Sequence, residues 1–382
     1  MRRKVTMGDL GTIITGNTPP RSMPELYGDY TPFVKATDIS EPEKYTYTPE
    51  ECYSKEGHDK YIRSLVPKGS TCVVTIGSIG KKMTMAHCDL FINQAMNAII
   101  PNENFDNEFV YYAVKNVLSN IKGLDSGTAS GRENVSKSAF SRMEVVVDDD
   151  LIIQQRIATI LSRYDSLIEN YQKQIKLLEE AAQRLYKEWF VDLHFPGHEN
   201  TKIVDGVPEG WELSKLGSLA EFKRGKTITK KDIVDGSIPV VAGGLEPAYY
   251  CDKSNTAERV ITVSGSGANA GFTRMYFEKV WASDCSYADL ETTQFLHFVY
   301  CFLKDNKTTI DNMQKGAAQP HVYAKDINAL ELYIPTEDVL ITYERNVSRY
   351  FNSILSLQSQ IRLLTEARDR LLPKLMSGEI KA

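Results

Sequence analysis

The sequence has no surplus of positive charge. Its 382 residues include 45 Lys and Arg against 50 Asp and Glu, which gives a formal charge of -5 and a pI near 5.8. A chain with this balance cannot attract an acidic polymer through its net charge, so any such surface has to come from local clusters of basic side chains. The length and composition are those of a globular protein of two or three domains.

Paired cysteines and long apolar runs are also missing. No run approaches the ~18 apolar residues of a membrane span, and the basic start of the chain has no apolar stretch behind it. The cysteines form no CxxC pair, which argues against a zinc site or a disulfide framework and is typical of reduced thiols. We therefore expect a cytoplasmic protein with neither a secretory nor a membrane-spanning segment. The six cysteines are Cys52, Cys72, Cys88, Cys251, Cys285 and Cys301.

Catalytic motifs occur only in broken form. Residues 220–227, AEFKRGKT, lack the first glycine of a phosphate-binding loop, and the equivalent residues 11–18 have that glycine but no lysine. Residues 17–20, NTPP, differ at two of four positions from the NPP-aromatic tetrapeptide of amino-methyltransferases. Residues 264–267, SGSG, lack the order of a nucleophile elbow. The sequence therefore predicts no catalytic residue in this chain.

A seam of apolar residues runs through residues 151–192, where neither Gly nor Pro occurs. The steps along the seam alternate between four and three residues, which is the pattern of a long helix that packs against a partner helix. Asp148–Asp150 precede the seam and offer an N-cap and the negative charge that favours a helix N-terminus. We predict one helix that starts there and ends near Phe190. The seam comprises Ile157, Leu161, Tyr164, Ile168, Tyr171, Ile175, Leu178, Ala182, Leu185 and Trp189.

Residues 336–377 repeat this pattern and provide the partner helix. The two segments match residue by residue: SRY at Ser162 recurs at Ser348, and QIKLLEEAAQRL at Gln174 recurs as QIRLLTEARDRL at Gln360. A duplicated helix is an internal repeat, so the rest of the chain should contain its other parts. The second seam comprises Val347, Tyr350, Ile354, Leu357, Ile361, Leu364, Leu371 and Leu375, with Arg368 at its one polar position.

The globular parts are duplicated too. Residues 211–335 echo residues 1–150 in the same order, and residues 193–210 read as a linker closed by a turn at 207–210. We predict an α+β fold: two similar domains separated by two long antiparallel coiled-coil helices, 151–192 and 336–377, and related by a pseudo-two-fold axis. About 40 helical residues span roughly 55–60 Å, a spacing suited to two half-sites on duplex DNA. In the first half the pattern predicts strands at 73–76, 97–100 and 144–147 and a helix over 107–121.

Polar, glycine-rich loops with basic and aromatic neighbours recur in both halves. Lys and Arg suit phosphates, and Arg, Asn, Gln and Ser can read base edges, although solvated turns between strands share this composition. Residues 1–150 include 17 basic and 20 acidic residues, and residues 211–335 include 14 basic and 15 acidic residues. Because neither half has net positive charge, DNA binding would depend on these clusters. The candidate DNA-binding residues are Tyr45, Tyr47, Ser78, Lys81, Lys82, Thr128, Ser130, Arg132, Asn134, Arg224, Lys226, Thr227, Ser266, Asn269, Arg274, Lys315, Gln319, His321 and Tyr323. No metal ligand is predicted.

The order of short motifs is more specific than any one of them. The second half reads Leu-Gly at 216, Gly-Lys-Thr at 225, Ile-Pro-Val at 238, Gly-Ser-Gly at 265, Lys-Gly-Ala-Ala-Gln-Pro at 315, Tyr-Ile-Pro at 333 and Gln-Ile-Arg-Leu-Leu at 360. The first half has Thr-Pro-Phe-Val at 31, Phe-Ile-Asn-Gln at 91 and Ser-Gly-Thr-Ala-Ser-Gly-Arg at 126. In this doubled order, over essentially its whole length, the chain resembles the specificity subunit of type I restriction-modification enzymes.

The resemblance implies two target-recognition domains, 1–150 and 211–335, each of which contacts one half of a bipartite site on double-stranded DNA. It implies that the spacer helices dock two modification (methyltransferase) subunits and that restriction (translocase and endonuclease) subunits join the complex. It implies no chemistry in this chain: S-adenosylmethionine, ATP and Mg are expected on the partner subunits. No membrane partner is implied.

Two alternatives come from other classes of protein. A self-contained DNA methyltransferase would need the cofactor loop and the NPP-aromatic motif that are missing here. A non-catalytic coiled-coil adaptor would explain the two long helices but not the paired globular halves with their glycine-rich polar loops. Sequence-specific retardation of duplex DNA separates the adaptor from the specificity subunit.

Overall fold

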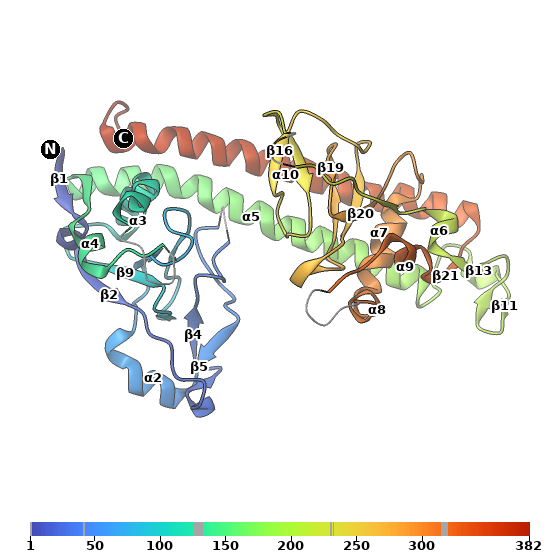
Figure 1. Cartoon of the computed structure of the whole chain (residues 1–382), viewed down its shortest axis with the longest axis horizontal. Helices are drawn as coiled ribbons and strands as arrows, with labels where there is room; N and C mark the ends of the chain where they lie inside the picture. Colours follow the sequence, from blue (N-terminus) through green and yellow to red (C-terminus); the bar gives the residue numbers. More distant parts are fainter. Residues whose placement is uncertain (1, 41–42, 126–132, 230, 232, 315–319) are drawn as a thin grey trace. The chain divides into compact units, whose positions relative to one another are not determined.

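The computed structural model describes residues 2–40, 43–125, 133–229, 231, 233–314 and 320–382 (Figure 1). The chain forms two compact units, Met1–Gln172 with Ser359–Ala382, and Lys173–Gln358. Each unit contains one globular half together with part of each of the two long helices. The units are therefore described one at a time.

The first unit contains two four-stranded sheets. One sheet has the antiparallel order β2-β9-β6-β7, and the other has the order β3-β5-β4-β8, in which β4 and β8 are parallel. A separate antiparallel pair, β1 with β10, joins the start of the chain to the residues that precede the first long helix. The strands are β1 Arg2–Thr6, β2 Gly11–Thr15, β3 Tyr27–Gly28, β4 Thr31–Val34, β5 Glu51–Tyr53, β6 Thr71–Val74, β7 Met83–Met85, β8 Phe91–Ile92, β9 Met96–Pro101 and β10 Glu144–Asp148.

The second unit repeats this topology with one strand fewer among the described residues. Its sheets have the orders β14-β20-β17-β18 and β16-β15-β19, again with one parallel pair, β15 with β19, and β13 pairs with β21 as β1 pairs with β10. Only β3 lacks a counterpart among the described strands. The predicted duplication is thus confirmed by the topology. The strands are β13 Glu212–Lys215, β14 Lys223–Arg224, β15 Ile238–Val241, β16 Tyr249–Cys251, β17 Val260–Ser264, β18 Thr273–Tyr276, β19 Trp281–Ala282, β20 Cys285–Asp289 and β21 Glu331–Ile334.

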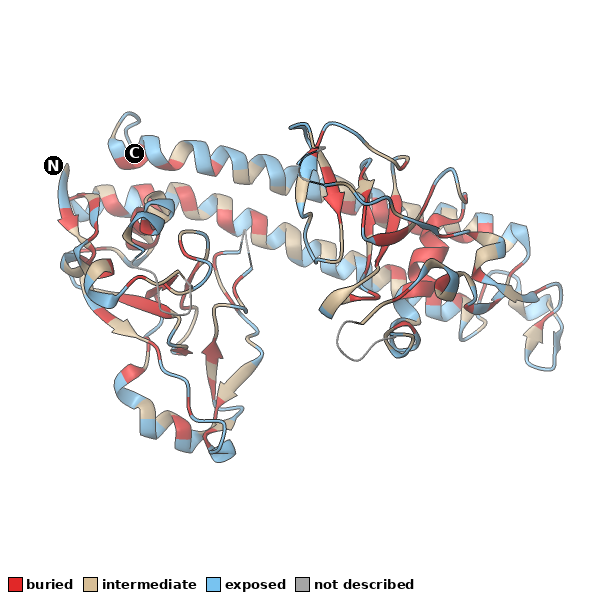
Figure 2. Cartoon of the chain, viewed as in Figure 1, coloured by how far each residue is buried: buried red, intermediate tan, exposed pale blue. Residues whose placement is uncertain are grey.

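One short helix in each unit is buried almost all round (Figure 2). Residues 109–114 of α3 (Asn107–Asn116) and 296–303 of α7 (Leu296–Asp305) are all buried. Each of these helices contacts strands of its own half and also side chains of a long helix, so no face is left for water. The remaining short α-helices are α1 Met7–Leu10, α2 Lys55–Tyr61, α4 Lys137–Arg142, α6 Leu216–Leu219, α8 Lys307–Asn312 and α9 Ala324–Asn328.

The two long helices are α5 (Leu151–Phe190, 40 residues) and α10 (Glu337–Ser377, 41 residues). The Ile152 amide donates to Asp150 Oδ1 at 2.9 Å, so the aspartate run does cap α5, and the predicted end near Phe190 is also confirmed. In the first unit α5 meets the C-terminal part of α10, and in the second unit it meets the N-terminal part, so the pairing is antiparallel. Among the described residues, no helix has the length and hydrophobicity that a bilayer crossing requires.

A buried ion pair joins the two helices in the first unit. Arg368 Nη1 on α10 donates to Asp165 Oδ1 on α5 at 2.5 Å, with the two side chains 3% and 6% exposed. The Tyr112 hydroxyl on α3 donates to the other oxygen of Asp165, also at 2.5 Å. Burial alone would lower the pKa of Arg368, but the hydrogen bond to Asp369 and the charge of Asp165 raise that pKa above its ordinary value. The cluster therefore connects α3, α5 and α10.

The second unit places apolar side chains at the equivalent positions. The heptad match pairs Asp165 with Phe351 and Arg368 with Ala182, and the match of α3 with α7 pairs Tyr112 with Cys301. All three of these residues lie in the core of the second unit, with exposures of 2%, 1% and 0%. The same three positions of the repeat thus hold an ionic cluster in the first unit and apolar side chains in the second.

One local prediction was wrong, and one feature was not predicted. The helix predicted over 107–121 ends at Asn116 and is followed by a 3₁₀ helix, Leu118–Leu124, because the poor helix formers Ser119, Asn120 and Gly123 follow. The linker 193–210 holds a hairpin of β11 (Ile203–Val204) and β12 (Val207–Pro208). The hairpin turns at Asp205–Gly206, both with positive φ, because Asp-Gly favours the tight turn of a two-residue hairpin. The turn predicted at 207–210 is also present: Glu209 and Gly210 form it, and the Trp211 amide donates to Pro208 O at 3.1 Å.

The ionic cluster can be tested by removing it in part and in whole. We expect Arg368→Met to reduce the free energy of unfolding by about 3–5 kcal/mol, because Asp165 then remains buried without its charge partner. The triple variant Arg368→Met, Asp165→Leu, Tyr112→Phe removes every charge of the cluster and should recover most of that loss. Urea unfolding followed by circular dichroism measures both. Equal losses in the single and triple variants would contradict this account.

Candidate nucleic-acid interface

Loops at one end of the first unit's strands come together through backbone hydrogen bonds. The Gly16 amide donates to Met96 O at 3.1 Å, and the Thr75 amide donates to Ala95 O at 2.8 Å. The end of β2, the end of β6 and the start of β9 therefore lie side by side. We call residues 16–18, 76–82, 93–95 and 133–134 the first loop edge.

Glycines allow this close approach. A Cβ on Gly16 would lie 2.2 Å from Asn93 O, so no larger residue fits between the two loops. Gly77 and Gly80 have φ of +88° and +71°, the left-handed region that side chains disfavour. The glycine positions in the first loop edge thus follow from backbone geometry.

The first loop edge joins two loops that the sequence singled out. Ile76 and Asn134 form an antiparallel bridge, and the Gly77 amide donates to Glu133 O at 3.1 Å. This pairing gathers the predicted residues Ser78, Lys81, Lys82 and Asn134, of which Ser78 and Lys81 are exposed. The predicted residues Thr128, Ser130 and Arg132 lie outside the described residues.

The second unit joins two of its loops by the same kind of backbone pairing. Ser266 and His321 form an antiparallel bridge, the Gly267 amide donates to Pro320 O at 3.0 Å, and the Val322 amide donates to Gly265 O at 3.1 Å. We call residues 225–227, 243–246, 265–269, 282–284 and 320–321 the second loop edge. It gathers the predicted residues Lys226, Thr227, Ser266, Asn269 and His321. The predicted residues Lys315 and Gln319 lie outside the described residues.

Three further predicted residues flank the second loop edge. Arg224 is exposed on β14, just before the edge begins. Arg274 on β18 donates to Leu245 O at 2.9 Å and lies 4.9 Å from the centre of the Tyr276 ring, so protein contacts hold it. Tyr323 is exposed and stacks on His321, with ring centres 5.8 Å apart and planes 9° apart.

Tyr45 and Tyr47 lie alongside β7 and not in the first loop edge. The Tyr45 hydroxyl donates to Glu108 Oε1 on α3 at 3.0 Å, and the buried Lys44 forms an ion pair with the same, partly exposed carboxylate. Burial, together with the charge of Glu108, raises the pKa of Tyr45. Tyr47 is 46% exposed and lies 4.9 Å from the His87 ring. Tyr45 therefore has a clear role in packing, whereas Tyr47 still offers an exposed ring.

The sequence prediction missed four exposed residues of the loop edges. The Thr18 hydroxyl donates to Gln94 Oε1 in the first unit, and the Ser266 hydroxyl donates to Asp284 Oδ2 in the second. Asn17 and Thr18 are the repeat partners of Lys226 and Thr227, so the duplication itself was a signal that could have found them. Gln94 ends the Phe-Ile-Asn-Gln motif at 91, which was not interpreted as a contact, and Asp284 has no such local signal. The four missed residues are Asn17, Thr18, Gln94 and Asp284.

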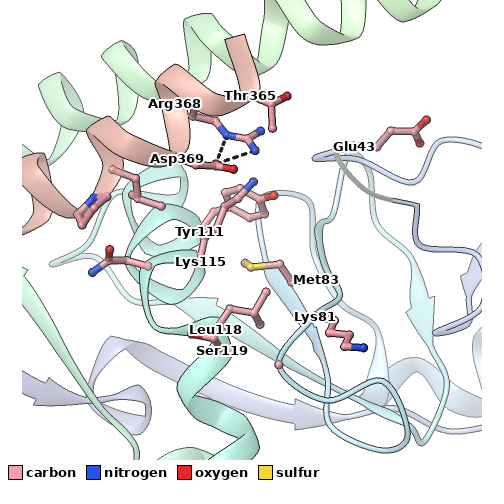
Figure 3. A pocket seen from close by; sticks show the side chains of 14 residues that line it. Glu43, Lys81, Met83, Tyr111, Lys115, Leu118, Ser119, Thr365, Arg368 and Asp369 are labelled. Atoms are coloured by element: carbon pink, nitrogen blue, oxygen red, sulfur yellow. Dashed lines mark hydrogen bonds and ion pairs between the residues drawn. The ribbon is translucent and has the colours of Figure 1, made fainter. Parts of the chain in front are cut away.

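An open pocket of about 440 Å³ lies next to the first loop edge (Figure 3). Lys81 comes from the loop edge, Tyr111 and Lys115 from α3, and Arg368 from α10. Figure 3 shows Arg368 and Asp369 on the helix above Tyr111 and Lys115, with Lys81 farther off on its loop. The pocket shows that the first loop edge and the ionic cluster are close neighbours within the first unit.

The family described as "Type I restriction modification DNA specificity domain" matches residues 3–180 and 208–342. The chain belongs to this family. The two matched ranges contain the two copies of the fold, each with one loop edge. Every candidate residue therefore lies within a segment that matches a DNA specificity domain.

Curated relatives support the same conclusion. The chain is 27% identical over 399 residues to the type I restriction enzyme MjaIX specificity subunit of Methanocaldococcus jannaschii, which covers 98% of this chain and 92% of the relative. It is 30% identical over 175 residues to the HindI specificity subunit of Haemophilus influenzae, over 45% of this chain and 38% of the relative. A crystal structure of the type I restriction-modification S subunit from M. genitalium superposes with a TM-score of 0.57 at 19% identity, covering 98% of this chain and 96% of that one, and so shares the fold.

The loop edges can be tested by reversing charge. We expect Lys81→Glu to weaken binding of the chain, assembled with its partner subunits, to all duplex sequences alike, if Lys81 contacts a phosphate, because phosphates are the same in every sequence. Each lost phosphate contact should make the slope of log affinity against log salt shallower by about 0.9. Lys68→Glu, an exposed lysine just before the opposite end of β6, is the control and should change neither quantity. Equal effects of the two variants in a salt titration would place the DNA surface elsewhere.

Proposed function

We propose that this chain is the DNA-recognition subunit of a type I restriction-modification system and that each of its halves contacts one half of a bipartite DNA target. The observation that supports this best is the duplicated loop edge. Both units bring a glycine loop after equivalent strands (β6 and β17) against the segment before a short helix, through one antiparallel bridge each. A chain with two equivalent polar edges is suited to two similar sites on one polymer.

The side chains at these edges have the chemistry for this role. Lys81, Lys82 and Lys226 suit phosphate oxygens, and Asn17, Gln94 and Asn269 suit base edges. The adaptor alternative assigns no role to such edges. In this proposal residues 1–150 and 211–335 are the two target-recognition domains, residues 151–192 and 336–377 are the spacer helices, and the candidate residues of both loop edges make the DNA contacts.

The proposed partners dock on the long helices. Leu177 on α5 and Leu363 on α10 occupy equivalent repeat positions and are 63% and 55% exposed, so both copies of the repeat present an apolar side chain at the same place. Beside Leu177 lies an open groove of about 520 Å³ lined by residues of α5 and α10. One apolar site in each unit is what two copies of one modification subunit would need. Restriction subunits would join the complex thus formed.

We propose that the chain itself is non-catalytic and acts in the cytoplasm. Methyl transfer from S-adenosylmethionine and ATP-dependent, Mg-dependent chemistry would belong to the partner subunits. The support is the broken state of every catalytic motif in the sequence, including two differently incomplete phosphate-binding loops at 11–18 and 220–227. A self-contained methyltransferase would instead transfer methyl groups as a purified single chain.

Exchange of one half tests independent recognition. Replacing residues 211–335 with the equivalent domain of a relative exchanges both strands of the β13–β21 pair together, in which Glu212 lies opposite Ile334. The exchanged domain therefore keeps the strand pair that joins its two ends. We expect the assembled complex to change one half of its recognised sequence and to keep the other. Methylation mapping of a random-sequence duplex library measures both halves. Loss of both halves in a folded chimera would contradict the proposal.

Docking can be tested with single substitutions. We expect Leu177→Asp and Leu363→Asp each to reduce the number of bound modification subunits from two to one, because each puts a charge into one apolar interface. Ile152→Asp is the matched control: Ile152 is 61% exposed on α5, and its repeat equivalent is already Asp338. Native mass spectrometry counts the subunits. Two subunits bound in both leucine variants would contradict this placement.

A further inference from the structure

The two loop edges differ in one chemical respect. The first presents the amide of Gln94, and the second presents the carboxylate of Asp284. Both residues are exposed and lie in the short loop that leads into the equivalent strands β9 and β20. Each accepts a hydrogen bond from a hydroxyl of another loop, Thr18 and Ser266 respectively. The position is thus tied to a neighbouring loop in both units, the loop after β2 in the first and the loop after β17 in the second, while its own donors and acceptors differ.

The hydrogen bond to Thr18 fixes which way the Gln94 amide faces. One lone pair of Oε1 accepts from Thr18, and no other described residue takes the second lone pair or the two Nε2 hydrogens. An acceptor beside a donor in one plane matches N6 and N7 of adenine in the major groove. Because the orientation is already set, little side-chain entropy would be lost on binding.

Asp284 offers acceptors only. Ser266 donates to Oδ2, and in the part of the chain that the structure describes no hydrogen bond reaches Oδ1. A carboxylate on a DNA-binding surface is repelled by phosphates, so it is tolerated where it meets a donor on a base. Cytosine presents its N4 amino group in the major groove, whereas adenine places the acceptor N7 beside its amino group, which would repel a second carboxylate oxygen.

We propose that Gln94 reads an adenine in the half-site of the first unit and that Asp284 reads a cytosine in the half-site of the second unit. This inference rests on the proposed function and specifies it further. It assigns the difference between the two half-sites to one side chain in each loop edge. Lysines of the same edges, such as Lys81 and Lys226, would hold the phosphates without selecting a base.

The test exchanges the two chemistries. Gln94→Glu and Asp284→Asn are close to isosteric, and both replacements can still accept the hydrogen bond from Thr18 or Ser266. The chain assembled with its modification subunits selects its target from a random duplex library, and competition with single-base-pair variants then gives the preference at each position. We expect Gln94→Glu to change one adenine preference of one half-site toward cytosine, and Asp284→Asn to change one cytosine preference of the other half-site toward adenine. Discrimination at that position should fall roughly 5- to 100-fold.

Two controls alter exposed polar groups near the opposite ends of the strands that meet at the loop edges. Asn104→Asp follows the far end of β9, and Glu258→Gln precedes β17; neither should change any base preference. If the wild-type complex selects no sequence, the proposed function itself fails. If it selects a bipartite target but Gln94→Glu and Asp284→Asn keep the wild-type preferences, the two residues only tie loops together and this inference alone is overturned. A change at several positions at once would also overturn it.

Discussion

The packing of α5 against α10 is the constraint on which each unit depends. Their shared seam is narrow, and its middle residues Tyr171, Ile175 and Leu178 are only half-buried. Toward the ends of α5 the seam is fully buried, as at Leu161 and Trp189, where a short buried helix of the globular half also covers it. A globular half is therefore needed to complete the burial of the helices, and the helices are needed to cover α3 or α7. Neither part would bury its apolar surface alone.

Duplication preserved this packing while its chemistry changed. Asp165 and Arg368 form a buried ion pair, whereas their equivalents Phe351 and Ala182 belong to the apolar core of the second unit. A buried ion pair adds little net stability over apolar packing of the same volume. Loss of one member strongly destabilises the fold, because the other charge stays buried without a partner. Its value lies in fixing register: sliding α10 along α5 would separate the two charges. In the second unit a carboxylate has a comparable role, because Glu344 on α10 accepts from the Phe298 amide near the start of α7 at 2.8 Å.

The sequence predicted those parts of the fold that depend on local pattern. The start of α5 follows from three aspartates before an uninterrupted seam, and the doubled topology follows from matched motifs in matched order. Asp165 was missed because it lies beside the seam, where a polar residue is ordinarily solvated, and its partners Tyr112 and Arg368 are 53 and 203 residues away in the chain. Gln94 was missed for the same reason, because its link to Thr18 spans 76 residues. Side-chain hydrogen bonds between distant loops leave no periodicity in a sequence.

The charge balance of the chain also has a physical explanation on the proposed function. Phosphate contacts are the same for every sequence, so a strongly basic subunit would hold the complex on the many non-specific sites of a genome. A recognition subunit without net positive charge, and with an acid such as Asp284 among its exposed loop residues, is repelled by DNA wherever the base partner is absent. Partner subunits can then supply the affinity for DNA. This chain can supply the loss of affinity that a mismatched base pair causes. The deficit of positive charge, which at first argues against a DNA-binding protein, is what a subunit selected for discrimination would be expected to show.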